Sequence, residues 1–253
     1  MEASLEFKNN DFYRAILVHN IFKASSKLKL TPNYQQSTII ILHNYLDIVI
    51  KHVNCIKENI IVLMSSLLLL NCKLTENLRT IRDICSVIIM LFNNDYNINQ
   101  INEDYIKIKM QVIEKEKFIL KVLNFNINFD VPFDNLFIIC SNMKLEDIIM
   151  KMALSILNDC MLSKKSIHIS YNVLAIGCIY ISKTIISKIE NIITNFNNEK
   201  WWLKYYNIHD DELIKTIIWI TSIQKHFKTF FCENEKVTIE KNIEFIYENI
   251  HEI

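Results

Sequence analysis

The sequence predicts an all-helical protein made of two similar halves, and three observations carry this prediction. Only one glycine (Gly177) and two prolines (Pro32 and Pro132) occur among 253 residues, whereas average usage is about 7% and 5%. Apolar residues make up 51% of the chain, and they recur at helical spacing. Because hairpin turns and phosphate-binding loops need glycines at positive φ, their scarcity argues against an all-β fold and excludes dinucleotide and P-loop sites.

The charge balance excludes further classes of protein. The 28 basic residues match the 28 acidic ones, so the formal net charge is zero. A neutral chain lacks the field expected of a protein that works on nucleic acid or on an anionic membrane. The apolar content is also too high for a disordered chain, and the remaining expectation is a folded helical protein with a sizeable core.

The first half contains five predicted helices. Phe12, Ile16, Leu17 and Ile21 lie on one face of a first helix that ends near Leu30, before Thr31–Pro32. The other four are expected at about 35–52, 57–74, 78–92 and 105–123, with an Asn-rich loop at 93–104 between the last two.

The third of these helices is apolar on all sides. From Ile60 to Leu70 only Ser65 and Ser66 are polar, and this run is shorter than the roughly 20 residues that a bilayer span requires. The first ten residues carry Glu2, Glu6 and Lys8 and no apolar run, so no secretory signal is expected. We therefore expect the third helix to lie at the centre of a helical bundle. We also expect a soluble, intracellular protein that is nuclear or cytoplasmic.

The fifth helix is long, charged and amphipathic. We expect its inward stripe to contain Ile106, Met110, Ile113 and Leu120, interrupted by Lys117 and flanked by Phe118 and Val122. Its polar face reads Glu-Lys-Glu-Lys over residues 114–117.

The second half repeats this plan after a linker at about 126–130. Its helices are expected at 133–143, 146–161, 170–186 and 210–227, with a polar break at 195–200. The end of the third helix, with Lys73, matches the run that ends in Lys183, and Phe118–Leu120 matches Thr216–Ile218. Apolar residues in 233–253 (Val237, Ile243, Ile246 and Ile250) predict one more amphipathic helix.

The residue types that carry catalysis or bind metals show no suitable pattern. Seven cysteines occur singly, without a C-x-x-C pair, and they fit reduced, buried thiols. The seven histidines lack metal-ligand spacing, so no metal site and no cofactor are expected. Asp210–Asp211 stand at a helix start, where acidic residues cap and stabilise helices. With no Ser–His or Cys–His arrangement visible, we expect the protein not to be an enzyme.

Several short runs of the first half resemble the cyclin family in order and spacing. Arg14–Val18 resembles the M-R-A-I-L motif of the first cyclin helix, with Tyr13 in the position of Met. Leu68–Glu76 resembles L-x-A-S-K-x-E-E at the end of the third helix, and Glu116–Phe125 resembles E-x-x-x-L-K-x-L-x-F of the fifth.

Other runs resemble the L-type cyclins most, with the K and T types close behind. Arg79–Ile84 resembles R-R-I-R-D-V, and Gln111–Ile113 resembles N-Q-V-I. In the second half, Leu157–Asp159 and Ala175–Ile181 resemble N-D-S and A-C-A-C-I-Y-L-A, and Trp201–Trp202 stand where these cyclins have tryptophan.

The resemblance implies a tandem cyclin fold. It predicts two five-helix cyclin boxes, with flanking helices at the N-terminal and C-terminal ends. The expected bounds are 11–131 for the first box, 132–231 for the second and 232–253 for the tail helix.

The resemblance also implies a non-catalytic subunit that forms a heterodimer with a cyclin-dependent protein kinase and activates it, in transcription and RNA processing or in cell-cycle control. In the family, the lysine that ends helix three and the glutamate of helix five meet and hold backbone groups beside the αC helix of the kinase. These positions are Lys73 and Glu116 here. The family's apolar positions around this pair match Leu70, Leu74 and Phe125. Glu76 matches the second glutamate of the L-x-A-S-K-x-E-E motif, and Thr75 replaces the first.

Each of these residues also has a simpler interpretation. Lys73 alone is a cation at a helix C-terminus, and Glu116 alone is part of a solvated charged face. Tyr13, Ile16 and Leu17 form a candidate docking patch or belong to the core. Asn20 stands where cell-cycle cyclins have tryptophan, which favours helix packing for Ile16 and Leu17. Trp201 and Trp202 are interpreted as packing between helices.

A second class of function stays open at this point. A cyclin fold also serves as a scaffold or as a general transcription factor, which binds partners without activating a kinase. A nucleic-acid-binding version should carry a basic stripe, and the neutral charge argues against it. The combination of Lys73 with Glu116 favours the kinase activator.

Overall fold

The computed structural model describes residues 2–52, 59–92, 103–127, 129–190 and 201–234, and every regular element among them is a helix. The chain divides into two compact units, Met1–Phe129 and Asp130–Glu235. The all-helical prediction is therefore confirmed, and each unit is described by itself below.

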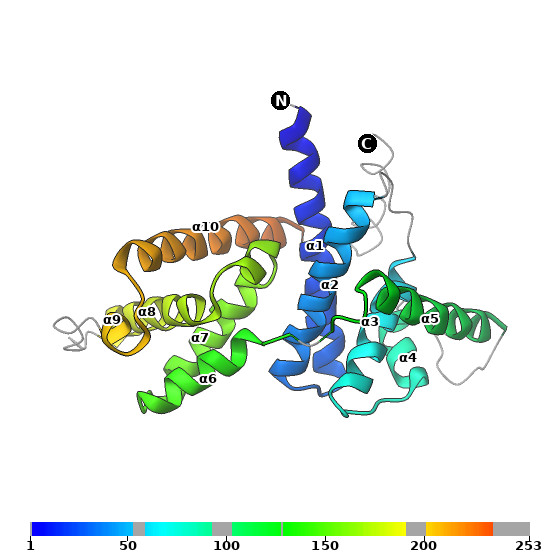
Figure 1. Ribbon diagram of the computed structural model, residues 1–253, viewed down its shortest axis with the longest axis horizontal. Coiled ribbons are helices and arrows are strands. Elements are labelled where there is room, and N and C mark those ends of the chain that lie inside the picture. The colour runs from blue at the N-terminus through cyan, green and yellow to red at the C-terminus, as the bar shows by residue number, and fades with distance from the viewer. Residues whose placement is uncertain (1, 53–58, 93–102, 128, 191–200, 235–253) are drawn as a thin grey trace. The chain divides into compact units, whose positions relative to one another are not determined.

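The first unit is built around one buried helix. Its helices are α1 (Glu2–Lys27), α2 (Pro32–His52), α3 (Ile60–Leu74), α4 (Ile81–Phe92) and α5 (Glu103–Val122). Helix α3 packs against the other four (Figure 1). It is buried on nearly all sides, Ser65 and Ser66 included, which confirms the prediction of a central apolar helix.

Local capping chemistry explains where these helices begin and end. Helix α1 ends three residues before the expected Leu30, because the Leu30 N–H donates to Ser25 O at 2.9 Å and Lys29 adopts a left-handed φ of 54°. Helix α2 begins at Pro32, whose fixed φ suits the first helical position. Helix α4 begins after Thr80, since the Thr80 hydroxyl accepts from the Asp83 N–H at 3.1 Å.

The prediction of a separate N-terminal flanking helix before Asp11 is corrected by the structure. The residues before Asp11 continue α1 without a break from Glu2, so the flank is helical but is not a helix of its own. The predicted tail helix at 232–253 lies largely outside the described residues.

The second unit repeats the packing pattern of the first. Its helices are α6 (Pro132–Asn142), α7 (Asp147–Cys160), the short 3-10 helix η1 (Lys164–His168), α8 (Tyr171–Glu190), α9 (Trp201–Tyr206) and α10 (Asp210–Asn234). Helix α8 packs against α6, α7 and α10, as α3 packs against α1, α2 and α5 (Figure 1). Gly177 allows the close approach of α8 to α10, because a Cβ there would lie 3.0 Å from Ile220 Cδ1.

The helix ends provide a second sign of the repeat. In α6, the Leu145 N–H donates to Cys140 O at 3.0 Å and Lys144 has a φ of 48°. This is the same ending as that of α1, with a left-handed lysine followed by a leucine. The corresponding first helices of the two units therefore share their C-terminal motif as well as their packing.

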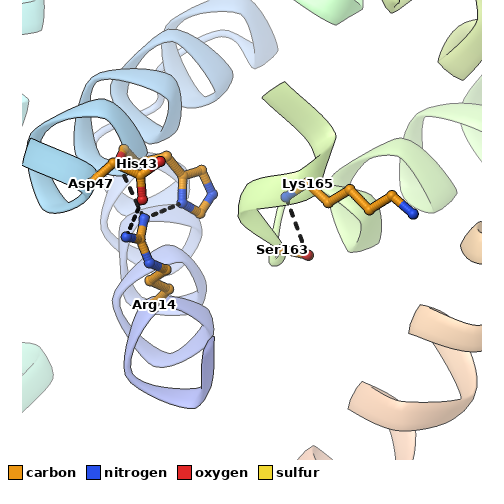
Figure 2. Close-up of polar contacts among 5 residues, drawn as sticks. All are labelled: Arg14, His43, Asp47, Ser163 and Lys165. Carbon is orange, nitrogen blue, oxygen red and sulfur yellow. Dashed lines mark hydrogen bonds and ion pairs between the residues drawn. The ribbon is translucent and has the colours of Figure 1, made fainter. Parts of the chain in front are cut away.

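Two short elements of the second unit were not predicted. The Ser163 hydroxyl caps η1 by accepting from the Lys165 N–H at 3.4 Å (Figure 2). Helix α9 carries Trp202, whose Nε1 donates to Asp210 Oδ1 at 2.9 Å and whose ring meets Tyr180 edge-on. Trp202 thus packs between helices, as predicted, while the side chain of Trp201 lies outside the described residues.

Candidate functional site

The C-terminal end of α3 meets α5 through an ion pair between Lys73 and Glu116. Lys73 Nζ donates to both carboxylate oxygens of Glu116, at 2.6 and 2.7 Å. The two side chains differ in depth, since that of Lys73 is 53% exposed and that of Glu116 only 7%. Glu116 is therefore a buried acid under a half-exposed ammonium, and the interpretation as a solvated charged face is wrong for Glu116.

The burial of Glu116 follows from the phase of α5. The stripe that faces the bundle contains Val112, Glu116, Ile119 and Leu123, which are three or four residues apart and share one face. The predicted inward stripe is the wrong one, because Ile106 and Met110 are 53% and 59% exposed. Glu116 thus lies at the edge of the core-facing side of α5, next to Lys73 at the end of α3.

Polar contacts fix the register of α3 against α5 close to this pair. The Ser66 hydroxyl donates to Val62 O within α3, at 2.6 Å, and lies 3.1 Å from Val112 O in α5. Val112 stands one turn before Glu116. The serine that interrupts the apolar run therefore helps to hold the two helices that carry the ion pair.

The end of α3 is also clamped to the start of α2. Asn71 Nδ2 lies 2.9 Å from Tyr34 O and 2.8 Å from Thr38 Oγ1, and Asn71 is 1% exposed. The Tyr34 hydroxyl donates to Leu68 O and lies 3.1 Å from Cys72 Sγ. Burial raises the pKa of Tyr34, which keeps the phenol protonated as a donor. These hydrogen bonds fix the orientation of the C-terminal end of α3 and therefore the position of Lys73.

The loop between α3 and α4 presents side chains beside the ion pair. Thr75 closes α3, since its N–H and its hydroxyl both donate to Asn71 O, at 3.0 and 2.9 Å. Glu76 follows in a left-handed conformation, with φ of 54°, and is exposed. Arg79 Nε donates to Leu28 O at 3.3 Å and so ties the loop to the end of α1.

The apolar residues predicted for this site separate into exposed and buried ones. Leu74 is 37% exposed and Phe125 is 66% exposed, whereas Leu70 is 2% exposed. Leu70 therefore belongs to the core under the surface. Leu78 is 73% exposed in the loop before α4 and was not among the predicted site residues. Its signal in the sequence is an apolar residue in an otherwise polar loop.

Phe125 is held outward by the ending of α5. The Phe125 N–H donates to Leu120 O at 2.9 Å, and the Asn124 N–H donates to Lys121 O at 3.0 Å. Asn124 and Phe125 both have left-handed φ angles, 49° and 58°. Asparagine tolerates such an angle, but it is unfavourable for phenylalanine, so the backbone bonds help to keep Phe125 in this place.

The candidate docking patch on α1 is mostly buried. Tyr13 is 7% exposed and Leu17 is fully buried, which leaves Ile16 as the partly exposed member. Between Tyr13 and Ile16, Arg14 forms a buried contact with α2: its guanidinium donates to Asp47 and to His43 O, the latter at 3.2 Å (Figure 2). Burial lowers the pKa of Arg14, and the nearby Asp47 carboxylate opposes this.

The described residues offer little for other chemistry. No group of three or more His, Cys, Asp or Glu side chains in the described part of the chain could hold a metal ion. Cys72, Cys85, Cys140, Cys160 and Cys178 are buried and free; Cys55 and Cys232 are outside the described side chains. No helix of the described ranges is long and apolar enough to cross a membrane.

What the Lys73–Glu116 pair can do follows from its geometry. An ammonium has three donor protons, and a carboxylate accepts at about four sites, so the pair retains one donor and further acceptor positions. Charge-assisted hydrogen bonds of this kind are stronger than neutral ones. The half-exposed ammonium is therefore suited to donate to a carbonyl group of a docked backbone, while the buried carboxylate fixes its position.

Comparisons with known proteins agree with this architecture. Residues 3–128 match the family described as "Cyclin, N-terminal domain". No curated protein matches the chain. Among solved structures, a chain of the yeast RNA polymerase II CTD kinase CTDK-1 complex is similar, with a TM-score of 0.65 and 15% identity over 86% of this chain and 67% of that one. A viral cyclin from herpesvirus saimiri is similar with a TM-score of 0.57 and 14% identity, over 85% of this chain and 84% of that one.

Proposed function

Because this chain belongs to the cyclin family, we propose that it binds a cyclin-dependent protein serine/threonine kinase and activates it as a non-catalytic subunit. The observation that carries the proposal is the bidentate contact of Lys73 with the buried Glu116. In this pair the ammonium of Lys73 is half-exposed and keeps a donor proton for a partner, while the buried Glu116 carboxylate holds it in place.

The proposed docking surface consists of Lys73, Leu74 and Glu76 at the end of α3, Leu78 in the loop, and Glu116 and Phe125 of α5 and its ending. The exposed Leu74, Leu78 and Phe125 supply the apolar contact, and the ion pair supplies the polar one. The docked element is the αC helix of the kinase, whose glutamate must pair with the catalytic lysine in the active enzyme. The subunit acts by stabilising that placement, so the kinase population shifts to its active state.

We propose a role in transcription in preference to cell-cycle control. The runs that resemble L-, K- and T-type cyclins support this, as does the similarity of the fold to a chain of a polymerase CTD kinase complex. A peptide of the polymerase C-terminal repeats is therefore the first substrate to assay, with histone as the comparison.

Recovery of the chain with its partner from its native cell tests the proposal. A tagged copy should bring down one protein kinase, identified by mass spectrometry, and the eluate should phosphorylate the polymerase repeat peptide. Glu116→Lys should lose both, because it places two ammonium groups together and removes the acceptor. Ile214→Asp, on an exposed position of the second unit, is the matched control and should retain both.

Two outcomes would reject the proposal. If folded Glu116→Lys still recovers and activates the kinase, the docking surface is wrong. If the wild-type chain recovers other proteins without kinase activity, the chain is a cyclin-fold scaffold.

A further inference from the structure

The outer face of α5 carries an apolar stripe that the first unit does not use for its core. Ile106, Met110, Ile113 and Leu120 follow helical spacing and define this outer stripe. Ile106 and Met110 are 53% and 59% exposed, and Ile113 and Leu120 are partly exposed. The buried stripe of the same helix, with Val112 and Ile119, makes the contacts to the bundle, so α5 has two apolar faces.

Basic side chains surround this outer stripe. Lys109, Lys117 and Lys121 are exposed beside or within it. Among the described side chains of α5 the acidic ones are Glu114, which is exposed, and Glu116, which is buried under Lys73. In a chain with a formal net charge of zero, the outer stripe is therefore a local region of positive charge around an apolar centre.

We infer that the outer stripe is a docking site for an acidic amphipathic helix of a partner protein. The spacing of Ile106, Met110 and Ile113 suits apolar anchors at i, i+3 or i+4, and i+7 of an opposing helix. The flanking lysines favour glutamate or aspartate beside those anchors and disfavour basic residues. From Ile106 to Leu120 the stripe is about 21 Å long, enough for four turns of the docked helix.

This inference goes beyond the proposed kinase docking and does not depend on it. The outer stripe lies on the next face of α5 beyond Glu116 and shares no residue with the proposed docking surface. It accepts an acidic helix whether or not Lys73 and Glu116 hold a kinase.

A synthetic peptide of defined composition tests the inference on the full chain. The probe is a fluorescein-labelled amphipathic helix of about five turns, with leucine on one face and glutamate on the others. Its counterpart carries lysine at every glutamate position. Fluorescence anisotropy should show saturable binding of the acidic peptide and at least tenfold weaker binding of the basic one. Added salt should weaken the acidic complex, because exposed charges are screened.

Variants then locate the binding. Met110→Asp and the triple change Lys109→Glu, Lys117→Glu and Lys121→Glu should each weaken acidic-peptide binding at least tenfold. Ile214→Asp, in the exposed pair Ile214 and Ile218 of α10, is the matched control and should leave it unchanged. The double change Lys73→Glu and Glu116→Lys should also leave it unchanged, which separates this site from the proposed kinase contact. Circular dichroism establishes that each variant is folded.

The inference is overturned if the acidic peptide does not saturate, if the basic peptide binds equally well, or if Met110→Asp binds like the wild type. Equal losses in Met110→Asp and Ile214→Asp would also overturn it, since binding would then follow general apolar exposure.

Discussion

At the scale of single residues, buried charges are the most sensitive points of the first unit. The side chain of Arg14 is 3% exposed and that of Asp47 is 22% exposed, and together with His43 O they join α1 to α2. Removing one partner of such a pair leaves a desolvated charge, which costs far more than the intact pair contributes.

Asp47→Asn is therefore expected to lower the free energy of unfolding by about 3 kcal/mol. Urea denaturation at neutral pH measures this. Asp83→Asn, at an exposed position in the first turn of α4, is the control and should stay within about 0.5 kcal/mol of the wild type. Equal effects of the two changes would mean that the Arg14 contact adds no stability.

His19 gives the first unit a pH dependence. Burial, and then the nearby Lys23, lowers the pKa of His19 from 6.5 to about 4. Between these two values the unfolded chain holds a proton on His19 that the folded chain does not. Stability therefore falls as the pH drops from 6.5 toward 4, and this histidine has no such effect above that window.

His19→Gln removes the titration. The difference in unfolding free energy between His19→Gln and the wild type should grow in favour of the variant when the pH is lowered from about 7 to about 5. A difference that is the same at both pH values would show that the folded state accepts the proton freely.

At the scale of elements, α3 is positioned by its polar residues more than by its apolar ones. Its leucines exclude water, but they are similar on all sides and do not fix its rotation. Asn71 donates to the start of α2, and Ser66 bonds toward Val112 of α5. These side chains select the orientation that brings Lys73 over Glu116.

Asn71→Ala tests this role. Loss of the amide leaves buried acceptors at the start of α2 without this donor, and we expect about 2 kcal/mol of destabilisation. The change should also weaken kinase association although Asn71 touches no partner. Asn142→Ala, exposed at the end of α6, should change neither quantity. Unaltered kinase association in a clearly destabilised Asn71→Ala would contradict the positioning role.

The sequence was sufficient for the helices because their signals are local. Apolar spacing, Pro32 and the scarcity of glycine predicted nine of the described helices, although α1 begins earlier and α10 ends later than expected. The starts and ends of α4 and α1 follow from the cap at Thr80 and from the left-handed Lys29. Helix α9 has six residues, too few to show a period, and it was missed.

The phase of α5 could not be predicted, because the helix has two apolar faces. The periodicity predicts that the larger stripe, with Ile106 and Met110, faces inward, but the stripe that contains the charged Glu116 is the buried one. The compensation for that buried acid is Lys73, which lies 43 residues earlier in the chain. A pattern read along one helix does not contain this contact, so only the family resemblance predicted that Lys73 and Glu116 meet.

At the scale of the whole molecule, the two units share a packing plan but differ at the candidate site. In the sequence repeat, Lys183 of α8 corresponds to Lys73. The described buried stripe of α10, with Leu213, Thr216 and Ile220, contains no acidic residue. Burial lowers the pKa of Lys183 to about 8, and nearby Cys140 opposes this. The second unit therefore has the lysine without the acid, which supports assigning kinase docking to the first unit alone. The domain bounds at 11–131, 132–231 and 232–253 stay predictions.

We propose that the Lys73–Glu116 pair docks the kinase, and the exchange Lys73→Glu with Glu116→Lys separates this role from a purely structural one. The exchange retains an ion pair between α3 and α5, so the unit should fold, but it places the acceptor where the partner requires a donor. We predict that the exchanged chain, folded by circular dichroism, binds the recovered kinase at least a hundredfold more weakly than the wild type and does not activate it, a loss of about 2.7 kcal/mol or more. If the exchanged chain binds and activates the kinase as the wild type does, the pair serves only to hold α3 on α5, and the account of the docking surface is wrong.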